Sequence, residues 1–234
     1  MSVAKALNEA AANEQFAALL AHELRNPLMP LRDAALALAH LDGNDPRNSS
    51  AHAIIQRQVQ TIADVVQTIV EISTLAGDAV QADPLASLEQ SVVDALEAAR
   101  VRAALFDVRI VVTTQIPDVM VRFERLALER VMGIMLDYAI HQTRPASEMT
   151  CGVRLKTGAA VFEVTESARG LTDVERVSLF DLETMSHRVP DSIHGGRVAL
   201  YLAKRLTGRY HGSLRCTSRG LGTGSKLALH IPLV

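Results

Sequence analysis

The chain has 234 residues, of which 48% are hydrophobic, 21% are charged and only 3% are aromatic, with no tryptophan. This composition excludes a disordered chain and leaves enough apolar material for the cores of one or two domains. The net charge of −2 comes without a basic stripe interleaved with aromatic residues, which argues against nucleic acid as a partner. Because Ala and Leu must supply much of the core, we expect a helix-rich protein.

Signals for membranes, secretion and metals are missing from the sequence. No apolar run reaches the roughly 18 residues that a membrane span needs, and the first residues lack a basic-then-apolar leader pattern. Two cysteines, Cys151 and Cys216, match no metal-binding spacing and suit a reduced interior. We therefore expect a cytoplasmic chain with no membrane span and no bound metal.

The first third of the chain predicts two long amphipathic helices. Over residues 8–40, Leu and Ala recur at spacings of three and four and form one apolar stripe. Turn formers fill residues 42–46, and a second helix follows over 50–76 with Ile and Val at heptad-like spacing. A lone hairpin buries its stripe poorly. We therefore expect two copies to pair as a four-helix bundle, the alternative being that the hairpin packs on its own chain.

A hinge is predicted over residues 77–84, and the pattern changes after it. The sequence there predicts helices over 85–104, 123–142 and 198–207, and strands over 108–114, 151–156, 159–165, 213–217 and 225–232. Strands clustered among helices are typical of a layered α+β sandwich. We expect an α helical hairpin over residues 1–78, followed by an α+β sandwich over residues 84–234.

The most informative local sequence is His22-Glu23-Leu24-Arg25-Asn26-Pro27-Leu28. His22 and Asn26 share a helix face off the apolar stripe, so the imidazole should be exposed. A neutral ring nitrogen can attack a phosphoryl group if Glu23 stabilises the charge on the other nitrogen. Pro27 within the helix should bend its axis. Zinc would need a second His at position 26, and the plain alternative is an ordinary surface histidine.

The string from His22 to Leu28 resembles the phospho-acceptor box of the sensor histidine kinases of two-component systems, and it stands on the first helix of the predicted hairpin. The resemblance covers nearly the whole chain. It implies a dimerisation and histidine-phosphotransfer domain over residues 8–76 and a domain similar to the kinases' ATP-binding sandwich over residues 84–234. It also implies that His22 is the phospho-acceptor, Glu23 its base, and Asn26 a residue used in dephosphorylation.

The magnesium-binding position of that family is altered. Registering residues 125–141 on the family's Asn-bearing helix places Tyr138 where the Asn belongs. A phenol with a pKa near ~10 is a poor Mg²⁺ ligand at neutral pH. Asp137 precedes Tyr138, but one residue on a helix is a rotation of about 100°, so Asp137 cannot take its place.

The adenine-binding box, which reads Asp-x-Gly-x-Gly in the family, is altered as well. Glu166 replaces the Asp and moves the carboxylate by one methylene, while Ala168 adds a Cβ where the family has Gly. Arg169 is large and charged, and Gly170 is retained.

The phosphate-binding box has no glycine at residues 197–200, although Gly195-Gly196 just upstream could form an anion nest. The lid region over residues 180–194 is short. The last box survives as Gly222-Thr223-Gly224-Ser225.

Four functions are open on this sequence. In the preferred one, His22 accepts a phosphoryl group from an Asp of one receiver domain and passes it to another. The receiver domain supplies the Mg²⁺, and this chain holds no tightly bound ATP or metal. In the second, the chain is an ATP-dependent kinase with a divergent, weak nucleotide site made by Glu166, Gly170, Gly222 and Gly224. In the third it is a response-regulator phosphatase that uses Asn26, and in the fourth an interaction module.

Overall fold

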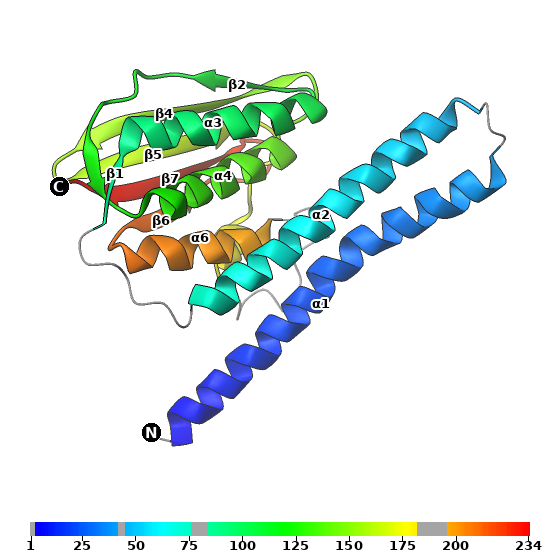
Figure 1. The fold of residues 1–234 in the computed structure, drawn as a ribbon, viewed down its shortest axis with the longest axis horizontal. Coiled ribbons are helices and arrows are strands. Elements are labelled where there is room, and N and C mark those ends of the chain that lie inside the picture. Colours follow the sequence, from blue (N-terminus) through cyan, green and yellow to red (C-terminus); the bar gives the residue numbers. More distant parts are fainter. Residues whose placement is uncertain (1–2, 42–44, 76–83, 182–195) are drawn as a thin grey trace. The chain divides into compact units, whose positions relative to one another are not determined.

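The structure, a computed structural model, describes residues 3–41, 45–75, 84–181 and 196–234. The chain divides into two compact units. The first is built on helices α1 (Val3–His40) and α2 (Arg47–Leu75), and the second holds all the strands and the remaining helices. Figure 1 shows the elements in chain order from blue to red.

Helices α1 and α2 pack together as a hairpin through a seam of shielded residues. On α1 this seam contains Leu24, Leu31 and Leu38 with the buried Pro27 and Ala34, at alternating spacings of three and four. The three leucines belong to the apolar stripe predicted from the sequence, but Leu28 and Ala35, which were predicted in the same stripe, are exposed. Helix α1 runs without interruption through Pro27 and also through Pro30.

The start of α2 is fixed by Asp45. Its Oδ1 accepts a hydrogen bond of 2.8 Å from the Arg47 amide, and its Oδ2 accepts one of 2.7 Å from the Arg47 guanidinium. These hydrogen bonds lower the pKa of Asp45 to about 2. An otherwise unpaired amide at the helix start is thereby satisfied.

The second unit contains two sheets. A small one pairs β1 (Leu85–Ser87) antiparallel with β3 (Met120–Arg122). The larger has the strand order β2-β4-β5-β7-β6, in which β2 and β4 are parallel and all other neighbours are antiparallel. Its strands are β2 (Val108–Val112), β4 (Ser147–Lys156), β5 (Ala159–Glu166), β6 (Ser213–Thr217) and β7 (Ser225–Pro232).

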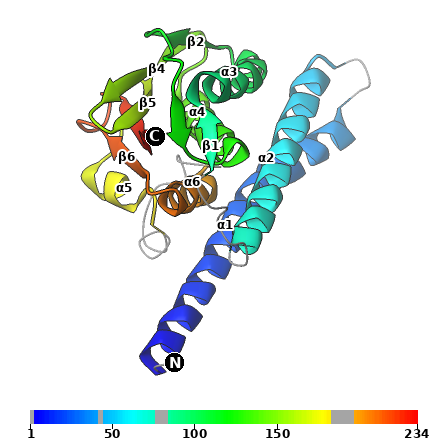
Figure 2. The same ribbon diagram turned by 60° about the vertical axis from the view of Figure 1, so that its left-hand side comes forward.

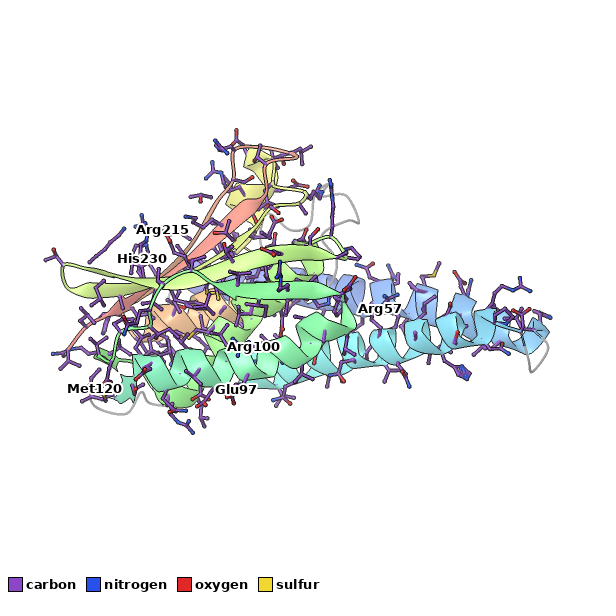
Figure 3. All side chains as sticks on the ribbon, turned by 90° about the horizontal axis from the view of Figure 1, so that it is seen from above. Arg57, Glu97, Arg100, Met120, Arg215 and His230 are labelled. Atoms are coloured by element: carbon purple, nitrogen blue, oxygen red, sulfur yellow. The ribbon has the colours of Figure 1, made fainter. Side chains whose placement is uncertain are left out.

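Three helices cover one face of the larger sheet: α3 (Leu88–Leu105), α4 (Arg125–Gln142) and α6 (Arg197–Arg209), as Figures 1 and 2 show. Fully buried side chains such as Phe162, Met132 and Leu200 form the core between the two layers. The opposite face of the sheet is mostly polar, and Arg215 and His230 lie on that side, away from α3, in Figure 3. One short helix, α5 (Asp173–Ser178), follows β5.

The predicted fold class, a helical hairpin followed by an α+β sandwich, is confirmed. Several element bounds differ from the prediction. Residues 85–87 form β1 instead of the first turn of a helix, because Ser87 caps α3 by accepting a hydrogen bond from the Gln90 amide. The short elements β3 and α5 were not predicted. Residues 77–83 of the predicted hinge lie outside the described residues.

Candidate functional site

The predicted phospho-acceptor box lies entirely on α1. Asn26 is half-buried, Pro27 is buried in the seam with α2, and Leu28 is 49% exposed. The side chains of His22 and Glu23 lie outside the described residues. The exposure of His22 and its contact with Glu23 therefore stay predictions, although the backbone places both residues in the helical register assumed for them.

Tyr138 lies in the last two turns of α4 and is only 4% exposed. Its hydroxyl is buried and has no hydrogen-bond partner within the described part of the chain. Burial, and then the neighbouring Cys216 and Glu166, raise the pKa of Tyr138 well above its usual value. A buried, protonated phenol in such surroundings does not offer the oxygen ligands that Mg²⁺ prefers.

Asp137 points elsewhere, as the helical rotation predicted. Its Oδ1 accepts a hydrogen bond of 2.5 Å from Nε of Arg102 on α3. This ion pair joins α3 to α4 on a different side of the helix from Tyr138. Asp137 therefore does not stand in for the missing Asn.

Glu166, at the end of β5, is 3% exposed, and its carboxylate is used by the neighbouring backbone. Its Oε2 accepts a hydrogen bond of 2.7 Å from the amide of Ala168. Ala168 is itself buried and, unlike Gly170, has no positive φ, which explains why a Cβ is accommodated at this position. The longer Glu side chain thus folds back onto its own turn.

Arg169 turns toward α5 and forms an ion pair there. Its Nη2 donates a hydrogen bond of 2.6 Å to Oε1 of Glu175, whose side chain is only 4% exposed. The other guanidinium nitrogen, Nη1, is buried without a partner among the described residues. Oε2 of Glu175 also accepts hydrogen bonds from the amide and the hydroxyl of Thr172, at 2.9 and 3.0 Å. Glu175 therefore binds Arg169 and caps α5 at once.

The surviving glycine box packs directly on the altered adenine box. The amide of Gly222 donates a hydrogen bond of 2.5 Å to the carbonyl of Arg169. A Cβ at Gly170, where φ is +68°, would collide with the Gly220 carbonyl, and one at Gly224 would collide with the Glu166 carbonyl. The sequence-predicted residues Glu166, Gly170 and Gly224 are thus brought together, and Gly222 joins them through its amide.

Ser218 joins the loop after β5 to the glycine turn through hydrogen bonds, and the sequence did not predict this role. Its hydroxyl accepts a hydrogen bond from the Leu171 amide at 2.9 Å and donates one to the Gly224 carbonyl at 2.7 Å. Glu175 was missed as well, although Thr172-x-x-Glu175 is a capping-box pattern that predicts the start of a helix. No comparable local pattern marks Ser218.

The phosphate-binding region is described only in part. Gly196 precedes α6 in an irregular segment, while Gly195 and the lid residues 182–194 lie outside the described residues. Val198 and Leu200, the other two residues of that box, are buried in the core and support packing of α6, while Ala199, which replaces one of the family's glycines, is half-buried.

Neither cysteine contributes to a reactive site. Burial raises the pKa of Cys151 to about 11 and that of Cys216 to about 12. No cluster of metal-ligating side chains occurs among the described residues. Within that same part of the chain, no helix is long and apolar enough to cross a membrane. A surface pocket of about 510 Å³ at the start of β2 and β4 contains none of the predicted site residues.

Together these side chains do not match the donor set of a magnesium–nucleotide site. A buried phenol stands where the family has an amide ligand, the Glu166 carboxylate accepts a hydrogen bond from the Ala168 amide, and an Arg–Glu ion pair joins the adjoining loop to α5. Only the glycine turn over residues 222–225 keeps the sequence expected for a ligand contact. In this structure its Gly224 packs directly against the backbone at the end of β5.

A helical hairpin bearing a phospho-acceptor box, joined to a sandwich of three helices on a mixed sheet, defines the core of a two-component histidine kinase. Two family models match accordingly: the His Kinase A (phospho-acceptor) domain over residues 12–77, and the histidine kinase-, DNA gyrase B- and HSP90-like ATPase over residues 123–234. The chain belongs to the two-component histidine kinase family.

Two curated relatives match over most of this chain. Sensor histidine kinase Hik2 of Thermosynechococcus vestitus is 28% identical over 226 residues, which cover 91% of this chain and 57% of that protein. Sensor protein DivL of Caulobacter vibrioides is 23% identical over 218 residues, covering 93% of this chain and 28% of that protein. The chain thus spans between about a quarter and three fifths of these relatives' lengths.

Solved structures share the fold at low identity. Histidine kinase ThkA in complex with response regulator TrrA has a TM-score of 0.68 at 16% identity, covering 100% of this chain and 67% of that one. Acinetobacter baumannii histidine kinase AdeS has a TM-score of 0.61 at 15% identity, covering 91% of this chain and 98% of that one. These likenesses support the fold.

Proposed function

We propose that the chain is a phosphotransfer protein of two-component signalling. His22 accepts a phosphoryl group from the aspartyl-phosphate of one receiver domain and donates it to an Asp of another. One observation carries the proposal: the box from His22 to Leu28 is intact on α1, while Tyr138, Glu166 and Arg169 depart from the nucleotide-binding pattern.

The chemistry needs no nucleotide in this chain. A ring nitrogen of His22 attacks the phosphorus atom, the P–O bond to the Asp breaks, and the carboxylate of the receiver leaves. Glu23 takes up the proton of the other ring nitrogen as the phosphohistidine forms. The second transfer reverses these steps on another receiver domain, and the receiver's own Mg²⁺ neutralises the phosphoryl oxygens.

Receiver domains are the proposed partners, and a second copy of the chain completes the docking surface. The kinase ThkA is described in complex with a response regulator, which supports a regulator as partner for this chain too. The hairpin leaves Leu28, Leu36, Val59 and Val66 about half exposed outside its own seam. These side chains suit a four-helix bundle, in which a second hairpin would cover them.

The test is transfer from receiver domains phosphorylated with radiolabelled acetyl phosphate. The wild-type chain should take up label within minutes, and His22→Gln should take up none. His40→Gln is the matched control, since His40 is an exposed histidine in the last turn of the same helix, and it should be labelled like wild type.

Two outcomes would count against the relay. Label acquired by His22 from radiolabelled ATP alone, without any receiver domain, would establish the autokinase reading in its place. Equal labelling of wild type and His22→Gln would place the accepting group elsewhere in the chain and overturn the assignment of His22.

A further inference from the structure

Four polar side chains lie on or beside the altered magnesium-binding and adenine-binding boxes of this chain. Tyr138 comes from α4, Glu166 from the end of β5, Arg169 from the following loop and Glu175 from α5. Three of these four were singled out in the sequence as departures from the family pattern. The structure gives Glu166, Arg169 and Glu175 internal hydrogen-bond partners, and it buries Tyr138.

The ion pair between Arg169 and Glu175 joins the loop after β5 to α5. The two charged groups meet at 2.6 Å, and the Glu175 side chain is only 4% exposed. Glu175 is also tied to Thr172 by three hydrogen bonds, two accepted by its carboxylate and one donated by its amide. Breaking a buried pair on one side leaves the other charge uncompensated, so each partner holds the other in place.

The loop that carries Arg169 is fixed on its other side by the glycine turn. The Arg169 carbonyl accepts the Gly222 amide, and the Leu171 amide donates to Ser218. No Cβ fits at Gly170 or Gly224 because the two loops are in direct contact. The loop between β5 and α5 is therefore held from both ends.

Tyr138 completes the arrangement from α4. Its ring is buried, and its hydroxyl has no partner among the described residues. Burying an unpaired hydroxyl lowers the stability of the fold, and the packing of the ring can offset that cost. An Asn at this position would be smaller and would leave part of that volume empty.

We propose that Tyr138 and the Arg169–Glu175 pair, which we call the internal clasp, occupy the nucleotide's place and keep the loop after β5 and helix α5 closed without any ligand. This inference deepens the proposed function: a domain that is closed by its own side chains has no need of ATP. It concerns the second unit alone, so it can fail while the transfer to His22 stands.

The first test measures hydrogen exchange by mass spectrometry on the full chain. Glu175→Gln should speed exchange of amides in residues 166–181 by ~10-fold, while amides of α3 stay as in wild type. Glu148→Gln is the matched control, because Glu148 pairs with Arg109 at the other side of the sheet. Unchanged exchange in residues 166–181, or equal acceleration throughout the second unit, would overturn the clasp.

The second test asks whether the ring of Tyr138 fills the place proposed for the nucleotide. Tyr138→Ala removes a ring and leaves a cavity that p-cresol can enter, so p-cresol should raise the thermal midpoint of this variant and leave wild type unchanged. Millimolar Mg-ATP should shift neither the midpoint nor the exchange of wild type. Stabilisation of wild type by Mg-ATP, or no response of Tyr138→Ala to p-cresol, would overturn the proposal.

Both measurements are made on the sample used for phosphoryl transfer. If His22 is labelled but the two clasp tests fail, the phosphorelay proposal stands and only the internal clasp is overturned. If the clasp tests succeed but His22 is not labelled, the phosphorelay proposal is overturned instead.

Discussion

At the scale of single residues, Tyr138 combines a buried ring with a buried hydroxyl that has no partner among the described residues. The sequence register over residues 125–141 predicts that this phenol stands where the family has an Asn, and that assignment stays a prediction. A buried hydroxyl without a partner costs about 1–3 kcal/mol. The ring contributes by filling space, so the oxygen and the ring have opposite effects on stability.

Tyr138→Phe should therefore raise the stability of the protein or leave it unchanged. The substitution keeps the ring and removes the unpaired hydroxyl, which predicts a gain of up to ~1 kcal/mol and a rise of about 2–4 °C in the thermal midpoint. Differential scanning calorimetry measures the change.

Tyr201→Phe on α6 is the matched control, since Tyr201 is only half-buried, and it should be near neutral. A loss of more than about 1 kcal/mol in Tyr138→Phe would show instead that the hydroxyl has a stabilising partner.

Side-chain partners could not be predicted at this scale. Glu166 reads as a displaced adenine ligand in the sequence, yet its carboxylate bonds the amide of Ala168 two residues away. Arg169 pairs with Glu175, six residues on, only because the chain turns there before α5. Such partners depend on loop geometry, which periodicity does not encode.

At the scale of elements, α5 depends on one ionised carboxylate. Although burial would raise the pKa of Glu175, hydrogen bonds from Arg169 and Thr172 lower it below its usual value. A carboxyl whose folded pKa is depressed stabilises the fold above its unfolded pKa. That stability is lost as the pH falls through the folded pKa.

The thermal midpoint should accordingly fall as the pH drops below about 4.3, the ordinary pKa of Glu, and Glu175→Gln should fall less steeply. Among the described residues, the charged neighbours of Glu175 include its ion-pair partner Arg169, and Asp173 and Arg176 on the same helix. Comparing the slope of the variant with that of wild type isolates Glu175 from the other carboxylates. Parallel slopes over this acidic range would contradict the role given to its charge.

Element length decided which elements the sequence revealed. Helices α1 to α4 and α6 each span several turns, so their apolar spacing repeats often enough to be recognised. The three-residue strands β1 and β3 and the six-residue helix α5 are shorter than two periods of any pattern. Residues 85–87 were assigned to a helix because they run into a genuine helical pattern without a break.

At the scale of the whole molecule, the hairpin carries a second stripe. On α2, positions 52, 56, 59, 63, 66 and 70 are exposed at spacings of four and three, and three of them are the valines Val59, Val66 and Val70. Such spacing is typical of a second packing seam, which a partner hairpin would cover.

Val66→Lys should shift the protein toward monomer in sedimentation velocity, because a charge in a covered seam would lose its hydration. The monomer mass to compare with is 25.3 kDa. Arg57→Ala, on the exposed polar face of the same helix, is the control and should sediment as wild type does. A wild type that is monomeric at micromolar concentration would contradict pairing through this seam.

The two buried thiols have a practical consequence for the whole chain. Cys151 and Cys216 are the only cysteines in the sequence, and both are enclosed with their protons firmly held. Maleimide dyes require an accessible thiolate, so the native chain gives little background labelling. One cysteine added on α2 and one at the open sheet face would therefore report the distance between the two units by fluorescence, without removing either native residue.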